Sequence, residues 1–279
     1  MKVAVLSGKG GTGKTFVAVN LAAVAEKATY IDCDVEEPNG RLFFKPQNTI
    51  TQAVTTLLPR FDVEKCTGCR TCVTRCRFNA LVLVKGRPLL FPEICHSCGG
   101  CVLFCPERAI TESVKQVGTV EWGESGNVRV VTGMMKVGEA SGIPLIKAAL
   151  AQAGEAESLT VIDCPPGSAC SVMESVEQAD YCILVAEPTA FGVHNLAMVH
   201  ELVGLLHKPC GLVINKADIP YPPLADFCEI HGVNVLSCIP YREDTALFCA
   251  KAQIAALQNE EIAVLFQRLL REVRKEAAI

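Results

Sequence analysis

The feature that most limits the possible folds is a glycine-rich stretch between an apolar segment and a segment with helical periodicity. Residues 2–7 (KVAVLS) have the composition of a buried strand, and residues 14–28 carry apolar side chains at the three- and four-residue spacing of a helix. Between them, GKGGTGKT at 8–15 matches G-x-x-x-x-G-K-[ST], a loop whose backbone N–H groups surround phosphates at the positive end of the helix. We expect Lys14 to reach the β- and γ-phosphates and Thr15 to bind Mg²⁺. The other loop residues expected to bind the nucleotide are Gly8, Gly10, Gly11, Thr12 and Gly13.

The rest of the chain alternates between apolar runs and helix-length segments. The runs lie at 29–35, 128–133, 159–167, 181–188, 210–218 and 233–241, and helices are expected near 142–153, 192–207 and 223–231 and at the C-terminal end. Near-continuous Val, Ile, Leu and Cys are typical of strands buried on both faces, which predicts an α/β fold with a doubly wound, mostly parallel sheet. The rhythm breaks at 60–113, where Pro and Gly are frequent. We therefore predict one discontinuous domain, residues 1–59 and 114–279, with a small α+β domain inserted at 60–113.

The predicted insert contains the same cysteine pattern twice. EKCTGCRTCVTRCRFNAL at 64–81 aligns with EICHSCGGCVLFCPERAI at 93–110, and each half contains C-x2-C-x2-C-x3-C. This pattern resembles a bacterial ferredoxin with two [4Fe–4S] clusters, in which the fourth cysteine of each run binds the other cluster. The resemblance implies two ligand sets: Cys66, Cys69, Cys72 and Cys105 for one cluster, and Cys95, Cys98, Cys101 and Cys76 for the other. Arg77 stands where the ferredoxin pattern has proline, a position that supplies no ligand.

A structural zinc site is the alternative for these cysteines. Such a site uses pairs of cysteines separated by a longer loop, which does not explain two runs of four. Residues 63–112 also hold seven Lys and Arg against four Asp and Glu, although the whole chain has a net charge of −4. A basic insert could dock an acidic redox partner, or it could be ordinary solvated surface.

The chain outside the insert resembles the MinD/ParA/nitrogenase-iron-protein superfamily of P-loop ATPases, whose phosphate loop carries a second lysine. The resemblance rests on KGGTGKT at 9–15, DCDVEEPN at 32–39, VIDCPPG at 161–167 and INKAD at 214–218. It implies that Lys9 reaches the nucleotide of a partner subunit and that Asp34 positions the attacking water. It also implies that Asp163 holds Mg²⁺ through its water shell and that Asn215 reads the adenine edge. Alternatives remain: either aspartate could cap a strand end, and NKAD also fits the guanine-reading N-K-x-D pattern.

The composition of the chain limits which binding partners and which cell compartment we expect. The net charge of −4 gives no general attraction to nucleic acid or to an anionic membrane, so neither is expected as a partner. Half of the 16 cysteines fall in the two runs, which favours metal ligation in a reducing compartment, and no export signal precedes the first strand. We expect a cytoplasmic protein. The amphipathic segment 260–277 is similar to the membrane-targeting tail of MinD, but we expect it to pack on the sheet.

Together these features predict an ATP-dependent homodimer that binds ATP, Mg²⁺ and two [4Fe–4S] clusters. We expect an ATPase whose nucleotide state is coupled to electron transfer with a redox partner. The alternative is assembly or carriage of iron–sulfur clusters, in which the clusters are cargo. A spatial-positioning ATPase and an amidating synthetase share the fold, but the synthetase would need a substrate pocket and a glutaminase domain.

Overall fold

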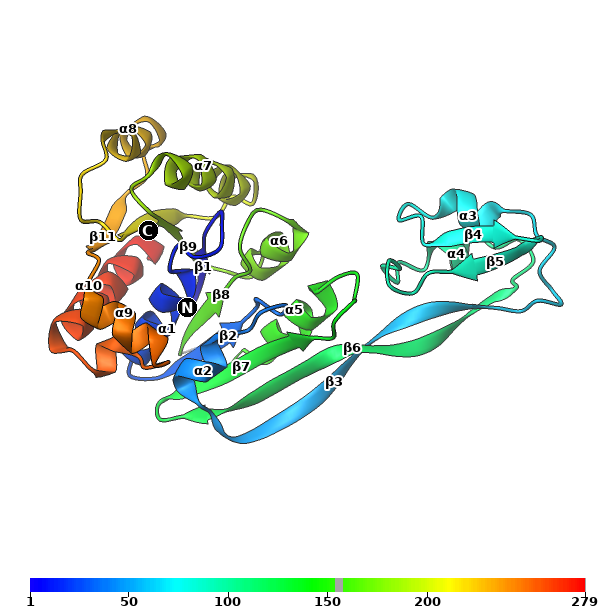
Figure 1. Ribbon diagram of the computed structural model, residues 1–279, viewed down its shortest axis with the longest axis horizontal. Coiled ribbons are helices and arrows are strands. Elements are labelled where there is room, and N and C mark those ends of the chain that lie inside the picture. Colours follow the sequence, from blue (N-terminus) through cyan, green and yellow to red (C-terminus); the bar gives the residue numbers. More distant parts are fainter. Residues whose placement is uncertain (154–157, 279) are drawn as a thin grey trace.

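The structure is a computed structural model that describes residues 1–153 and 158–278. Its main feature is a nine-stranded sheet in the order β11-β10-β9-β1-β8-β2-β7-β6-β3 (Figure 1). Seven neighbouring strands are parallel: β1 (Lys2–Leu6), β2 (Ala28–Asp32), β7 (Val128–Met135), β8 (Leu159–Asp163), β9 (Tyr181–Ala186), β10 (Cys210–Asn215) and β11 (Val235–Ile239). The α/β class and the mostly parallel sheet are therefore confirmed.

Helices cover both faces of this sheet because its strands alternate their side chains between two cores. In β1, Val3 and Val5 face one core and Ala4 and Leu6 face the other, and all four are fully buried. The first core is closed by α1 (Lys14–Ala23), α2 (Gly40–Phe44), η1 (Ala255–Leu257) and α10 (Glu260–Ala277), beside α9 (Glu243–Ala250). The second core is closed by α5 (Ile143–Leu150), α6 (Cys170–Val176), α7 (Ala190–Leu205) and α8 (Pro222–His231).

The final helix packs as expected. Ile262, Phe266, Leu269, Leu270 and Val273 of α10 are buried in the first core, and the Phe266 ring meets Phe16 edge-on at 5.6 Å. Within residues 1–153 and 158–278, no helix is long and apolar enough to span a membrane.

Two long strands were not predicted from the sequence. β3 (Gln47–Phe61) and β6 (Ile110–Ser125) pair antiparallel over almost their whole length, and β6 also pairs antiparallel with β7. The pairing of β6 with β7 begins at Gly118 and Met135, so that residues 110–117 and their β3 partners leave the sheet as a two-stranded ribbon. The predicted helix 14–28 is also too long: α1 ends at Ala23, and the chain turns before β2 begins at Ala28.

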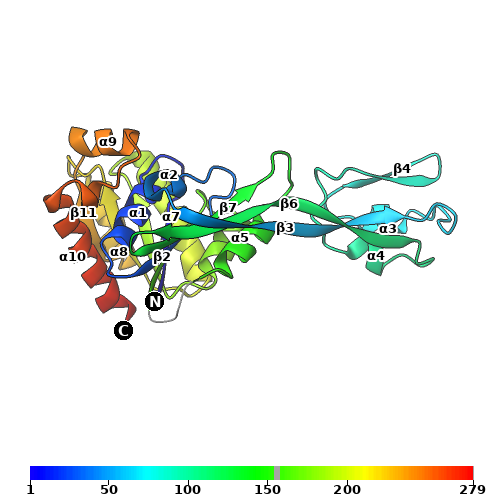
Figure 2. The ribbon, with the colours of Figure 1, turned by 90° about the horizontal axis from the view of Figure 1, so that it is seen from below.

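The outer end of the ribbon carries residues 62–109, which we call the cysteine module. It contains two short helices, α3 (Thr71–Arg75) and α4 (Gly100–Leu103), and a hairpin of β4 (Leu81–Val84) and β5 (Arg87–Leu90). Figures 1 and 2 show it standing away from the helices that cover the large sheet.

Candidate functional site

The glycine-rich loop connects β1 to α1 at the carboxyl edge of the parallel strands. β1 lies between β9 and β8, where the chain crosses from one side of the sheet to the other, and this is where open α/β sheets bind ligands. Gly13 has φ +93°, and a side-chain carbon at this position would collide with Nδ2 of Asn215. Glycine is therefore required at this position both for its backbone conformation and for the close approach of β10.

A cavity of about 510 Å³ opens over this loop, a volume within the usual range for small-molecule sites. Lys9, Lys14 and Thr15 line it from the loop and α1, and Asp34 lines it from the segment after β2. The opposite wall comes from Asn215 and Lys216 after β10 and from residues 239–249 around the start of α9.

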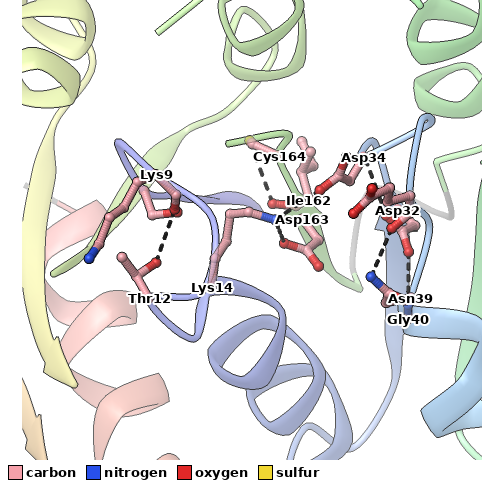
Figure 3. Close-up of polar contacts among 12 residues, drawn as sticks. Lys9, Thr12, Lys14, Asp32, Asp34, Asn39, Gly40, Ile162, Asp163 and Cys164 are labelled. Atoms are coloured by element: carbon pink, nitrogen blue, oxygen red, sulfur yellow. Dashed lines mark hydrogen bonds and ion pairs between the residues drawn. The ribbon is translucent and has the colours of Figure 1, made fainter. Parts of the chain in front are cut away.

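Lys14 and Asp163 form a buried ion pair at the base of the cavity (Figure 3). Nζ of Lys14 lies 2.7 Å from Oδ1 of Asp163 and 3.9 Å from Oδ2 of Asp34. The hydroxyl of Tyr30 donates to Oδ2 of Asp163 at 2.8 Å, so both carboxylate oxygens are engaged. Burial lowers the pKa of the Lys14 ammonium, but Asp163 raises it, and the net pKa lies above the usual value. Lys14 is therefore positively charged.

Two further carboxyl groups stand beside this pair. Asp32 is fully buried and accepts hydrogen bonds from the backbone N–H groups of Gly40, at 2.9 Å, and Asp34, at 3.2 Å. Burial, with the nearby charge of Asp163, raises the pKa of Asp32 to about 8. Burial also raises the pKa of Asp34 to about 6, although Lys14 opposes this shift. The end of β2 and the segment after it thus each carry a carboxyl group with a raised pKa.

Lys9 points away from Lys14 in this structure (Figure 3). Its Nζ lies 3.3 Å from Oε2 of Glu187, and the other oxygen of Glu187 pairs with Lys216. Lys216 also donates to the carbonyl of Gly11 at 3.3 Å. Glu187 therefore holds the Lys9 side chain away from Lys14 within the cavity, and a role toward a partner's nucleotide stays a prediction.

Asn215 and Asp218 differ in their relation to the cavity. Asn215 lines it and donates through Nδ2 to the carbonyl of Thr12 at 2.7 Å, which ties β10 to the loop. Asp218 is not among the described residues of the cavity wall, and its Oδ1 accepts from the backbone N–H of Tyr241 at 2.9 Å. This bond occupies the carboxylate that an N-K-x-D motif would use for guanine. The adenine-reading role of Asn215 remains a prediction.

The internal repeat of the cysteine module is present in its backbone. Residues with positive φ occur at matching positions: Gly68 and Ser97, Arg70 and Gly99, Asn79 and Arg108. The hydrogen bonds match too, since the N–H of Cys76 donates to Val73 O at 3.2 Å and that of Cys105 donates to Val102 O at 3.3 Å. The two halves therefore fold alike despite their different side chains.

Each half contributes to two small cavities, and each cavity is lined by four cysteines. One is lined by Cys66, Cys69, Cys72 and Cys105, and the other by Cys95, Cys98, Cys101 and Cys76. These are the two cross-paired sets expected from the ferredoxin resemblance. The backbone N–H of Ala109 also donates to Sγ of Cys105 at 3.3 Å, a type of bond that tunes cluster thiolates.

The described residues contain no group of three or more His, Cys, Asp or Glu side chains arranged to hold a single metal ion. A cubane differs from such a site because each of its four thiolates binds a different iron.

Several residues that line this cavity or contact the residues lining it were not predicted. In the sequence Tyr30 looks like an ordinary strand residue. Its hydrogen bond to Asp163 depends on the pairing of β2 with β8, which the sequence does not show. Glu187 follows β9, and Tyr241 and Arg242 follow β11, in sequence contexts that carry no phosphate-binding pattern. The position of Glu187 directly after a buried strand was the available signal, since strand ends at this edge carry the site.

The substitution Gly13→Ala should weaken binding of Mg-ADP at least tenfold, because it adds both a strained φ and a collision with Asn215. Isothermal titration calorimetry measures the affinity. Gly126→Ala is the matched control, since Gly126 also has positive φ, +59°, but has open space around it in the β6–β7 turn. Equal affinities of Gly13→Ala and the wild type would contradict the close packing of loop and β10.

The raised pKa of Asp32 predicts that stability without nucleotide falls as pH rises. Between its ordinary pKa of 3.8 and about 8, this carboxyl binds more protons in the folded than in the unfolded chain. The free energy of unfolding should therefore decrease by up to about 1.4 kcal/mol per pH unit from this group. Denaturant titrations from pH 5 to 8 should show a smaller slope for Asp32→Asn, whereas Asp226→Asn on the exposed side of α8 should keep the wild-type slope. An unchanged slope in Asp32→Asn would refute the assignment.

Comparison with known proteins agrees with this geometry. The family model of the CobQ/CobB/MinD/ParA nucleotide binding domain matches residues 3–253. The uncharacterized protein MJ0578 of Methanocaldococcus jannaschii is 26% identical over 99% of this chain and 97% of its own length. An iron-sulfur cluster carrier protein of Pyrococcus furiosus is 50% identical over 52 residues, which are 17% of this chain and 18% of that protein.

Solved structures show the same fold. The cell division ATPase MinD of Pyrococcus furiosus superposes with a TM-score of 0.62 at 18% identity, covering 98% of each chain. The septum site-determining protein MinD of Pyrococcus horikoshii, in complex with Mg-ADP, has a TM-score of 0.58 at 18% identity, covering 98% of this chain and 95% of that one. Because the family match spans most of its residues, this chain belongs to the CobQ/CobB/MinD/ParA family of P-loop nucleotide-binding proteins.

Proposed function

We propose that this protein is an ATP-dependent dimeric switch that carries two [4Fe–4S] clusters and couples its nucleotide state to electron transfer with a redox partner. The observation that carries the proposal is the grouping of eight cysteines around two cavities in the cross-paired sets of a two-cluster ferredoxin. In this proposal one chain combines the nucleotide-binding site of its family with a module for electron transfer. In this proposal residues 60–113 form the inserted ferredoxin-like domain.

The module residues fit clusters in three respects. Each cavity has four thiols, its wall includes apolar side chains such as Leu81 and Leu83, and the backbone offers an N–H to Cys105. Thiols must lose their protons to bind iron, so cluster binding has to overcome the burial that raises the pKa of Cys101 to about 11. When bound, such clusters supply reversible one-electron transfer, whose potential depends on local charge and hydrogen bonds.

The nucleotide part of the proposal assigns roles within the described cavity. Lys14 would exchange its contact with Asp163 for the β- and γ-phosphates, which frees Asp163 to hold Mg²⁺ with Thr15. Asp34, at the cavity wall, would position the attacking water. Lys9 would leave Glu187 and place its charge on the nucleotide of a second copy, in the manner of an arginine finger. The P. horikoshii MinD complex with Mg-ADP supports a magnesium–nucleotide ligand for this fold.

The covalent connection between the two parts supports their coupling. The chain passes from Asp34 through α2 directly into β3, which leads to the cysteine module. A segment that responds to nucleotide would therefore pull on the strand that carries the module. Nucleotide state would then change the position or exposure of the cysteine cavities relative to a partner.

A second candidate function is carriage of iron–sulfur clusters as cargo. The 52-residue similarity to an iron-sulfur cluster carrier protein favours it. Transfer of iron from the protein to an apo-ferredoxin distinguishes the two functions. A carrier delivers its clusters within minutes and is left without iron, whereas an electron-transfer protein keeps them.

Anaerobically purified protein should contain about eight iron atoms per chain, since two clusters contain four iron atoms each. Cys76 and Cys101 line the same cavity although they lie in different runs. The variants Cys76→Ser and Cys101→Ser should therefore lose the same cluster and show the same EPR spectrum after reduction by dithionite. Cys238→Ser, an exposed cysteine outside the module, should keep the full iron content. About one zinc per chain without a reducible signal would rule out the ferredoxin assignment.

The coupling itself predicts a nucleotide-dependent reduction potential. Because coupling free energies are reciprocal, a non-hydrolysable ATP analogue should shift the cluster potential, and reduction should change ATP affinity by the matching factor of about 5–150. For a one-electron couple this factor corresponds to roughly 40–130 mV. Lys14→Ala, which cannot hold the phosphates, is the control and should show no shift. Light scattering of the same samples reports whether the analogue also produces a dimer.

Identical potentials and affinities with and without the analogue would mean that the two parts only share a chain. The cluster-carrier function would then be preferred.

A further inference from the structure

A single lysine on the ribbon contacts both the cysteine module and the nucleotide-binding domain. Nζ of Lys115, on β6, lies 2.7 Å from Oε2 of Glu139 and donates to the carbonyl of Pro92 at 3.3 Å. Pro92 lies three residues before Cys95, the first cysteine of the second run. Glu139 lies in the loop between β7 and α5, and its side chain is only 10% exposed. The lysine therefore bridges two segments that are distant in sequence.

The loop that carries Glu139, residues 136–142, reaches from the end of β7 toward the near edge of the module in both views (Figures 1 and 2). Its start is fixed to the ribbon because the N–H of Lys136 donates to the carbonyl of Val117 at 2.9 Å. It lies just where the β6–β7 pairing ends at Gly118 and Met135. Beyond this point the ribbon has only two strands, which are marginally stable without further support.

The same loop also packs on the segment that carries Asp34. The N–H of Met135 donates to the carbonyl of Val35 at 2.9 Å. Side-chain carbons placed on Gly133 and Gly142 would come within 2.6 Å and 2.5 Å of the methyl groups of Val35. Glycine at both positions lets Val35 fit between the end of β7 and the start of α5. A shift of Val35, next to Asp34, would therefore displace the loop.

Of the two cysteine cavities, the second, which is lined by Cys76, Cys95, Cys98 and Cys101, lies nearer to this contact. Its wall includes Leu57 and Pro59 of β3 and Glu112 of β6, whereas the first cavity is bounded by Phe61 and Ile110 at the outer end of the ribbon. The two cavities are thus offset along the ribbon by at least two residues, about 7 Å at ~3.4 Å per residue. The second cavity therefore lies nearer to the nucleotide-binding domain along the ribbon, and the first lies nearer to the outer end.

We propose that Lys115 and Glu139 form a positioning pair that transmits movement of the Asp34 segment to the loop before Cys95, and so to the second cysteine set. The path runs from Asp34 to Val35, to loop 136–142, to Lys115 and to Pro92. This inference rests on the proposed nucleotide–cluster coupling and specifies the contact that carries it. The covalent route through β3 is alone insufficient, because a two-stranded ribbon can twist without moving one cavity relative to the other.

The pair has properties that suit this role. Both side chains are largely shielded from water, so their attraction is screened less by salt than that of a surface pair. Lys115 has a fixed position on β6, opposite Thr56 of β3, and therefore moves with the ribbon. A loss of either partner would leave the Pro92 loop without its connection to residues 136–142.

The test compares hydrogen exchange and potential in the iron-loaded protein. In the wild type, a non-hydrolysable ATP analogue should change deuterium uptake in residues 136–142 and also in residues 90–95. In Lys115→Met the change in deuterium uptake should persist in residues 136–142 but vanish in residues 90–95. The 5–150-fold difference in ATP affinity between reduced and oxidised protein should fall below about twofold in this variant. Glu139→Gln should act in the same direction, and Lys115→Arg, which keeps charge and donor, should restore both effects.

Lys147→Met is the matched control. It removes a lysine from another ion pair of the same domain, with Glu174 at 3.4 Å, and should leave both effects at wild-type size. If Lys115→Met lost iron, Glu139→Gln would decide the question, since it leaves the Lys115–Pro92 contact in place.

The outcomes separate this inference from the proposed function. Wild-type changes that survive in both Lys115→Met and Glu139→Gln would overturn the positioning pair and leave nucleotide–cluster coupling intact. A wild type without any nucleotide effect on the potential or on residues 90–95 would overturn both. Loss of the effect in Lys147→Met as well would show a general loss of stability and would also overturn the inference.

Discussion

The buried ion pair between Lys14 and Asp163 is the interaction on which the rest of the site depends. A charged lysine and a charged aspartate are stable at this depth only because they face each other at 2.7 Å and Tyr30 satisfies the second carboxylate oxygen. This arrangement requires β1, β8 and β2 to be neighbours, since the three side chains come from or directly follow these strands. It also keeps the charges of Lys14 and Asp163 balanced until a phosphate and a magnesium ion separate them. Burial, with the nearby charge of Asp163, raises the pKa of Asp32 beside the pair to about 8, so a further negative charge is disfavoured here.

The cysteine module depends on a different constraint, the ribbon of β3 and β6. These strands extend the sheet by antiparallel pairing at its outermost edge, beyond β7, so the central strands around β1 keep their parallel register. The cysteine module contributes no described residue to either hydrophobic core. The ribbon joins the sheet at β7, next to β2 and three strands away from β1 and its phosphate loop. A route from nucleotide to module through the sheet therefore passes through residues that follow β2 and β7.

The parts that could be predicted from sequence are those fixed by local patterns. Apolar runs such as 159–163 and 181–186 are buried on both faces and appear as strands at the expected positions. The two cross-paired cysteine sets could be expected because the runs resemble those of a two-cluster ferredoxin, in which the fourth cysteine of each run binds the other cluster. β3 was not predicted because most of its side chains are exposed and polar, as in QNTITQ at 47–52, so that no apolar period marks it. Likewise Tyr30 contacts Asp163, 133 positions away, and Glu187 contacts Lys9, 178 positions away. Lys115 contacts Pro92 and Glu139, 23 and 24 positions away, so a local sequence pattern does not reveal these pairs.

The position of the ribbon explains how a nucleotide-binding fold can carry the cysteine module without a change in the order of its central strands. The chain leaves the domain after α2 and returns through β6 into β7. All of β2 pairs with β7. Both connections of the module are therefore attached to the strands whose ends carry Asp32, Asp34 and Val35. A displacement at these strand ends reaches the exit strand through the backbone, and it reaches the return strand through Val35, loop 136–142 and Lys115. If β3 and β6 move together, the module shifts as one body. If one strand moves relative to the other, the module rotates about the ribbon. Lys115 contacts Pro92, in the segment between Leu90 and Cys95, which both line the second cysteine cavity. Such a rotation would therefore change the surroundings of that cavity more than those of the outer one.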